Sequence, residues 1–293
     1  MVMMFLLVLS GGAVSGCNNV LQKYLFRERN APFEVSVVAT MLGAGLFLWV
    51  AQLVWFGVPR FPPPFWGPFV ATAILNVGII YWGDKAKKIE DASIVSPLQG
   101  VTPILVVFTS WLLLKEFPTA WGLVGIFTTV LGVYVLAMKR SDTKSISGFV
   151  QPWNRLFHSG GARLALLTAV LGSVALNFDK LVVLNSSPMM RGGTVFTTVA
   201  IIVLSALVAT GRWKQLDKSC FVPLFGIGLL IGLSNLLMDW GFLFGIVPYV
   251  GSLKRFQIIV TTFLSGVFLH EGDWGFRIAA AAVILLGIIL IAF

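Results

Sequence analysis

Charged residues are scarce in this chain, and so are cysteine and histidine. Asp, Glu, Lys and Arg make up 11% of the 293 residues, whereas 57% are hydrophobic. A soluble domain of this length needs a charged surface, so the composition excludes one. Cys17 and Cys220 fall in or beside apolar segments and demand no disulfide, while His158 and His270 share no spacing with other metal-ligating residues. The sequence therefore predicts no metal site.

Long apolar runs take the place of a charged surface. A helix rises about 1.5 Å per residue, so about 20 residues are needed to cross a hydrocarbon layer. The first run is too long for a signal peptide and has no basic segment before it, so we expect it to be retained. We predict an all-α integral membrane protein, in a bacterial inner (plasma) membrane, with ten spans. They are expected at residues 2–24, 33–57, 65–88, 92–114, 119–138, 163–184, 190–210, 221–243, 246–269 and 274–292.

The second half of the chain repeats the first. At a constant offset of 155 residues, Asp84 aligns with Asp239 and Glu116 with Glu271 (239 − 84 = 271 − 116 = 155). Repeats of this kind recur in secondary transporters, whose substrate site lies between the two halves. Each copy holds five predicted spans, and an odd number inverts the second copy in the membrane. We therefore predict two inverted five-helix repeats, at residues 1–138 and 163–293, joined by a basic loop at 139–162.

The basic residues of the predicted loops are unevenly distributed. Most follow the first, third, fifth, seventh and ninth spans, and only Arg60, Lys115 and Arg191 are assigned to the opposite side. Lys and Arg are kept in cytoplasmic loops. This bias places the central loop in the cytoplasm and both termini outside.

A few charged residues fall well inside predicted spans, where they are costly and mark candidate functional sites. Lys254 and Arg255 lie eight or nine residues into the ninth span, about 12 Å deep. Asp239 and the pair Asp179-Lys180 come to a comparable depth. One interpretation is structural, with Asp239 pairing with Lys254 or Arg255 to hold helices together. The other is functional, because three cations against two acids leave one positive charge for an anionic substrate.

The fourth span supplies neutral polar groups at the positions related to this cluster by the repeat. Gln99 stands 155 residues before Lys254, and Ser96 and Thr102 lie a turn away on either side. Pro97 and Pro103 interrupt the same span, and such interruptions occur at transporter binding sites as well as at simple kinks. We expect these three polar side chains to face the substrate cavity.

Other features bear on energy and chemistry. There is no Gly-x4-Gly-Lys-Ser/Thr loop for nucleotide hydrolysis, and no set of nucleophile and base, so we predict that the protein is not an enzyme, holds no cofactor and binds no nucleic acid. Energy must then come from a gradient or an exchange, with Asp239 or Asp179 as a hypothetical proton carrier. Glu116 and Glu271 end the fourth span of each copy, where a turn-capping role explains them.

Several short motifs mark the two copies. They are Ala-Ser-Ile-Val-Ser-Pro-Leu at 92–98, Thr102-Pro103, Leu114-Lys115-Glu116 and Leu131-Gly132-Val133, with Leu269-His270-Glu271 and Leu286-Gly287 in the second copy. These motifs resemble those of the EamA-like branch of the drug/metabolite transporter superfamily. The resemblance implies two five-helix halves and the transport of amino acids, drugs, sugars or nucleotide-linked metabolites. Lys254-Arg255 also resembles the Lys-Arg pair that contacts phosphate in the phosphate-translocator and nucleotide-sugar branches.

Together these observations predict a secondary transporter, monomeric or homodimeric, that moves a small anionic metabolite by alternating access and is coupled to a proton or another ion. A flippase for a phosphate-bearing lipid, which needs a lateral opening, remains an alternative. So do an exporter of amino acids or drugs and a non-transporting membrane sensor or scaffold. The predicted substrate-binding residues are Lys254, Arg255, Lys180, Gln99, Ser96 and Thr102, and the predicted coupling residues are Asp239 and Asp179.

Overall fold

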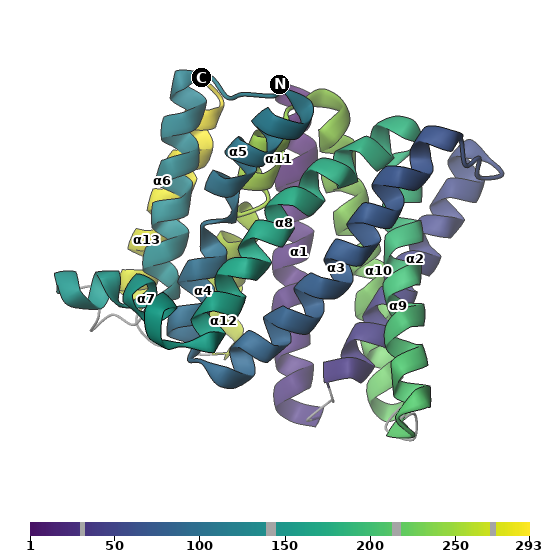
Figure 1. Ribbon diagram of the computed structural model, residues 1–293, viewed down its shortest axis with the longest axis horizontal. Coiled ribbons are helices and arrows are strands. Elements are labelled where there is room, and N and C mark those ends of the chain that lie inside the picture. The colour runs from purple at the N-terminus through teal and green to yellow at the C-terminus, as the bar shows by residue number, and fades with distance from the viewer. Residues whose placement is uncertain (30–32, 139–144, 213–217, 270–273) are drawn as a thin grey trace.

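A computed structural model describes residues 1–29, 33–138, 145–212, 218–269 and 274–293 (Figure 1). These residues form helices and contain no strand. The helices are α1 (Val2–Arg29), α2 (Phe33–Phe56), α3 (Pro63–Ile89), α4 (Ala92–Gly100), α5 (Thr102–Leu114), α6 (Ala120–Ala137), α7 (Ile146–His158), α8 (Gly160–Asn185), α9 (Pro188–Ala209), α10 (Lys218–Phe244), α11 (Val247–Leu253), α12 (Phe256–Leu269) and α13 (Trp274–Ile291).

Nine helical stretches within the described residues are long and apolar enough to cross a membrane, with α4 and α5 counted as one. They correspond to nine of the ten predicted spans. The predicted span at 246–269 differs, because a turn at Lys254 and Arg255 divides it into α11 and α12. Neither residue at this break is a proline or a glycine. The break therefore left no signal in the sequence, unlike the one between α4 and α5, which Pro97 and Pro103 flank.

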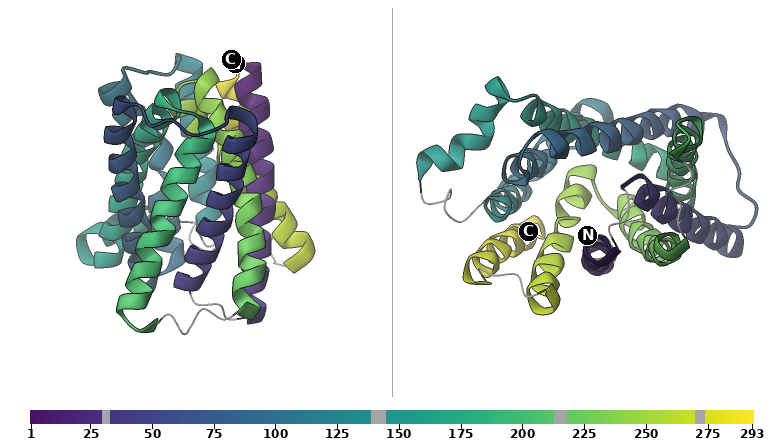
Figure 2. Two further views of the ribbon diagram at one scale, coloured as in Figure 1. Left: turned by 90° about the vertical axis from the view of Figure 1, so that its right-hand side faces the viewer. Right: turned by 90° about the horizontal axis from the view of Figure 1, so that it is seen from below.

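Helices that are far apart in the sequence pack side by side. α3 packs on α8, α1 on α10 and α12, and α6 on α13, while α2 lies between α9 and α10. These contacts join the two halves of the chain into one bundle (Figure 2). Both termini lie at the same end of it (Figure 1), as they must if the chain crosses the membrane an even number of times.

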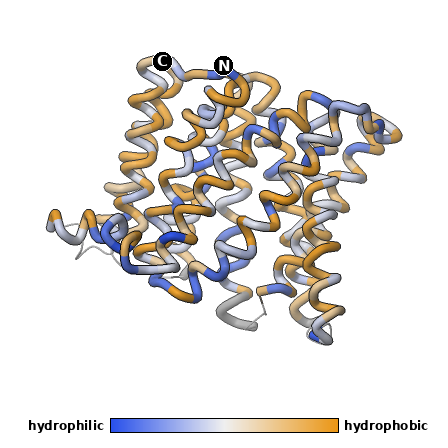
Figure 3. The backbone as a smooth tube through the Cα atoms, in the orientation of Figure 1, coloured by the Kyte–Doolittle hydropathy of each residue, from blue (hydrophilic) through white to orange (hydrophobic). Residues whose placement is uncertain are grey.

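Hydropathy varies along the bundle as expected for a membrane protein. Figure 3 shows hydrophobic residues over most of its length and hydrophilic residues gathered at the end opposite the termini. Large apolar side chains such as Trp111, Phe127 and Leu131 are exposed on the outer surface. An apolar surface of this extent requires lipid rather than water around it.

One amphipathic helix lies inside the segment predicted as a basic loop, 139–162. Helix α7 begins after Ser145, whose hydroxyl accepts a hydrogen bond from the Gly148 amide at 3.0 Å. The Tyr134 hydroxyl of α6 donates to the Phe149 carbonyl at 2.7 Å and ties α7 to the bundle. The low mean hydropathy of the segment concealed this helix, although its apolar residues recur at helical spacing.

Close packing of α2 on α10 depends on glycine. A Cβ atom at Gly228 would lie 2.4 Å from the Thr40 carbonyl oxygen, and one at Gly43 would lie 2.3 Å from the Phe225 carbonyl oxygen. Such contacts between backbones are the general use of small residues in membrane helices.

We expect Gly228→Leu to destabilise the protein by about 1–3 kcal/mol, because the new side chain must separate the two helices. Gly226→Leu is the matched control, since a Cβ at Gly226 would have no neighbour within 4 Å. Thermal unfolding of the purified variants measures both. Equal melting temperatures for the two variants would show that the close approach of α2 to α10 does not contribute to stability.

Candidate functional site

Two cavities meet at the breaks between the half-helices. The first, called cavity A, has a volume of about 380 Å³ and lies between α3, α4, α5 and α8. The second, called cavity B, has a volume of about 630 Å³ and lies between α1, α4, α6, α12 and α13. Gln99 and Arg255 line both, so these two residues stand where the cavities adjoin. Their linings include residues near helix ends, Lys87 in the last turn of α3 for cavity A and Ala137 at the end of α6 for cavity B.

The polar residues predicted in the fourth span lie at these cavities. Ser96 lines cavity B and Thr102 lines cavity A. The Gln99 side-chain amide donates to the Thr168 hydroxyl of α8 at 2.8 Å, and the Thr102 hydroxyl donates to the Gln99 carbonyl at 2.6 Å. The second bond crosses the break between α4 and α5, where the helix leaves backbone carbonyls without helical partners. The interruption thus presents hydrogen-bonding groups to the cavities.

Arg255 is placed at the break between α11 and α12, and its side chain is half-buried in the wall of both cavities. Its Nε atom is buried and has no hydrogen-bond partner in the described part of the chain. No acidic side chain of the described residues forms an ion pair with it either. A buried donor without an acceptor is costly, so this guanidinium is suited to an acceptor supplied from outside the chain.

Lys254, its neighbour, points elsewhere. The Lys254 ammonium lies over the Phe242 ring, 5.1 Å from its centroid, and lines neither cavity. Its charge interacts with those of Asp239, Arg191 and Asp179. The structure thus separates the two members of the predicted pair, with Arg255 at the cavities and Lys254 beside a network of buried charges.

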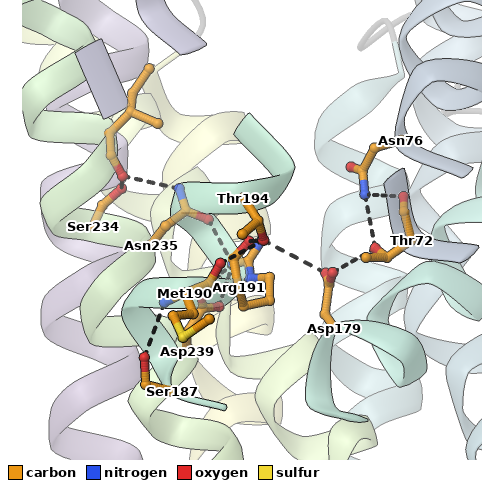
Figure 4. Close-up of polar contacts among 11 residues, drawn as sticks. Thr72, Asn76, Asp179, Ser187, Met190, Arg191, Thr194, Ser234, Asn235 and Asp239 are labelled. Atoms are coloured by element: carbon orange, nitrogen blue, oxygen red, sulfur yellow. Dashed lines mark hydrogen bonds and ion pairs between the residues drawn. The ribbon is translucent and has the colours of Figure 1, made fainter. Parts of the chain in front are cut away.

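That network is built around Arg191, the site residue that the sequence analysis missed (Figure 4). The Arg191 Nε donates to Asp239 Oδ2 at 2.8 Å, and its Nη2 contacts both carboxylate oxygens of Asp239. Its Nη1 lies 3.9 Å from Asp179 Oδ2. Arg191 is 4% exposed, Asp239 0% and Asp179 6%. These three residues are called the buried triad below.

The buried triad corrects two predictions. Arg191 was counted among the basic residues at one membrane surface, at the start of the predicted span 190–210, but α9 begins at Pro188, so Arg191 lies within the helix and between α8 and α10. Asp239 was expected to pair with Lys254 or Arg255, whereas its direct partner is Arg191. The only signal for Arg191 was its position, within two residues of the predicted start of an apolar span.

Polar side chains surround the triad. The Thr72 hydroxyl donates to Asp179 Oδ1 at 2.6 Å, and the Asn76 amide donates to Thr72 in turn at 3.1 Å (Figure 4). On the other side, Arg191 Nη2 donates to Asn235 Oδ1 at 3.3 Å. The network thus connects α3, α8, α9 and α10.

Lys180 takes part in a different contact, on α8. Its ammonium forms an ion pair with Glu116 and donates to the Gly245 carbonyl at 2.8 Å. Glu116 also accepts a hydrogen bond from the Val247 amide at 2.8 Å, so it caps the start of α11 in the other half of the chain. The turn that it was predicted to cap contributes a hydrogen bond from the Ser110 hydroxyl at 3.3 Å. Glu271, its counterpart in the repeat, lies outside the described residues. The structure therefore places Lys180 away from the two cavities.

The distribution of these groups is asymmetric along the bundle. Cavities A and B are lined by residues near the ends of α3 and α6, such as Lys87 and Ala137. The buried triad and the Lys180–Glu116 pair instead join the last turns of α8 and α10 to the first turn of α9 and to the residues after α5, toward the other end of the bundle. Within the described residues no cluster of three or more His, Cys, Asp or Glu could hold a metal ion. The cavities thus offer hydrogen-bonding groups and one guanidinium to a polar solute, whereas the buried triad and Lys180 pair their charges within the protein.

Comparison with known proteins agrees with this architecture. Residues 2–138 match the EamA-like transporter family, which confirms the resemblance found in the sequence. A solved structure titled "Crystal structure of protein" has the same fold, with a TM-score of 0.76 and 17% sequence identity over 98% of this chain and 96% of that chain. No curated protein matches the chain.

Proposed function

We propose that this chain, whose residues 2–138 belong to the EamA-like transporter family, moves a small anionic metabolite across its membrane by alternating access. The family match and the long apolar helices together indicate a membrane transporter of small molecules. The observation that carries the anionic substrate is Arg255, a guanidinium in the wall of both cavities whose buried Nε has no partner in the described chain. Arg binds carboxylate and phosphate groups through a planar fork of donors.

The proposal includes ten membrane crossings in two inverted repeats, 1–138 and 163–293, with α11 and α12 together as the ninth crossing. Two observations support it. The helix breaks at Val101 and at Lys254–Arg255 fall within two residues of equivalent positions of the 155-residue offset (101 + 155 = 256). The packing of α3 on α8 is also matched by that of α10 on α1, which is the exchange of partners expected for an inverted pair.

In this proposal the structure corresponds to a state open at the end opposite the termini. Opening of the other end requires the contacts of the buried triad and of Lys180 with Glu116 to separate. Lys180 and Lys254 reach the substrate only after these contacts separate. We therefore keep both as proposed substrate-binding residues in the state that is open at the other end. Asp179 and Asp239 share Arg191, and protonation of one carboxylate removes an attraction that holds the closed end together.

Binding of anions to the purified protein tests the proposal. We expect ethyl phosphate or acetate to raise the melting temperature of the wild type, because a ligand that binds only the folded state stabilises it by mass action. The stabilisation should be lost in Arg255→Gln and kept in Arg163→Gln, whose arginine is exposed on α8. Tetramethylammonium should stabilise none of them.

Stabilisation of the wild type and Arg255→Gln to the same degree would contradict the proposed site. Stabilisation by the cation alone would contradict the anionic substrate.

A further inference from the structure

A third hollow lies on the outside of the bundle, between α12 and α13. It has a volume of about 250 Å³ and is called the α12–α13 groove. Small residues, Gly266, Ala281 and Ala282, form part of its lining, beside the larger Phe263 and Ile278. Phe263 is 58% exposed and Ile278 56%, so the groove opens on the surface that faces lipid.

The groove adjoins cavity B, because Thr262 and Arg277 line both. The other residues of the groove wall are apolar, whereas Arg255 lines cavity B. An apolar hollow on the lipid-facing surface and the cavity that holds Arg255 therefore lie side by side.

An apolar groove beside an arginine-lined cavity fits a molecule with an apolar chain and an anionic head. From Arg277 to Leu285 the groove follows α13 for eight residues, about 12 Å at the helical rise, which is long enough for most of a short alkyl chain. Trp274 stands at the start of α13 and packs edge-on against Phe263, with ring centroids 6.2 Å apart. Tryptophan near a helix end is typical of the membrane interface, where lipid headgroups lie.

We propose that the transported anion is a lipid-like amphiphile that enters from the bilayer between α12 and α13, with its head at Arg255 in cavity B and its chain in the α12–α13 groove. This inference rests on the proposed function, because it uses the same Arg255 site. It differs from that function in naming a lateral route and an apolar tail.

Chain-length dependence of binding tests the inference. Hexyl phosphate and ethyl phosphate are titrated against the protein in nanodiscs of zwitterionic lipid. Each methylene that leaves water gains about fourfold in affinity, so hexyl phosphate should bind wild type at least tenfold more tightly than ethyl phosphate. The amount of hexyl phosphate that associates with nanodiscs of the Arg255→Gln variant measures its partition into lipid. This amount is subtracted from the amount that associates with wild-type nanodiscs.

Two variants distinguish binding of the alkyl chain in the groove from its binding to the surrounding lipid-facing surface. Ala282→Phe fills the groove and should reduce the chain-length gain to about threefold or less, with ethyl phosphate binding unchanged. Ala279→Phe adds the same ring at an exposed position of α13 outside the groove and should keep the full gain.

If ethyl phosphate binds through Arg255 but the longer chain adds nothing, or adds as much in Ala282→Phe as in the wild type, the lateral route is overturned and the proposed function stands. If ethyl phosphate binding does not depend on Arg255, both fail together.

Discussion

Replacing Arg191 with methionine is expected to destabilise the protein by about 3–5 kcal/mol, the largest effect that we predict for a single substitution. Asp239 is fully buried, and Arg191 is its only direct ion-pair partner in the described part of the chain. Methionine has a similar length but no charge, so the buried Asp239 carboxylate would lose its direct partner and keep only the more distant charge of Lys254. Thermal unfolding followed by tryptophan fluorescence measures the loss.

A second substitution distinguishes lost charge pairing from lost packing. Asp239→Asn in the Arg191→Met background removes the unpaired carboxylate and should recover much of the stability, since neither partner is then charged. Arg163→Met, at an exposed arginine, should leave unfolding unchanged. If the Arg191→Met variant unfolds at the same temperature as the wild type, Arg191 does not stabilise this part of the protein interior.

Asp179→Asn is expected to abolish accumulation driven by a pH gradient while leaving exchange at equal pH intact. Of the two acids beside Arg191, Asp179 is held less firmly, with its carboxylate 3.9 Å from Nη1 and a single hydrogen bond from Thr72. Asp239, by contrast, contacts two guanidinium nitrogens. We therefore propose Asp179 as the proton carrier, because its protonation breaks fewer contacts.

Uptake of labelled ethyl phosphate into proteoliposomes, with and without an imposed pH gradient, measures this effect. Asp91→Asn is the control, since Asp91 is exposed and lines neither cavity. Gradient-driven accumulation by Asp179→Asn at the wild-type level would show that this carboxylate carries no coupling proton.

Much of the fold could be predicted from the sequence because its signals are local or periodic. Long apolar runs give the spans, and an offset of 155 residues gives the duplication. Helix α7 was not predicted, because its apolar residues form a stripe along one face rather than a continuous run. The break at Lys254 and Arg255 was not predicted, because neither residue disfavours a helix strongly.

The site was harder to predict, because the partner of a buried charge is set by tertiary packing. Depth along a helix brought Asp179, Lys180, Asp239, Lys254 and Arg255 into one layer. It could not say which way each side chain turns, and the structure divides them among Arg191, Glu116 and the cavities. Arg191 was missed since a residue at the predicted edge of a span can as well belong to a loop.

Counterflow of ethyl phosphate is the measurement that tests the central proposal most directly. Proteoliposomes loaded with unlabelled ethyl phosphate should take up the labelled compound through the wild type and through Arg163→Gln. Uptake through Arg255→Gln should fall at least tenfold, because the substituted amide keeps a neutral donor and loses the charge. Equal uptake by Arg255→Gln and the wild type would contradict the assignment of Arg255 as the anion-binding residue. Absence of counterflow for ethyl phosphate through the wild type would contradict the proposed anionic substrate.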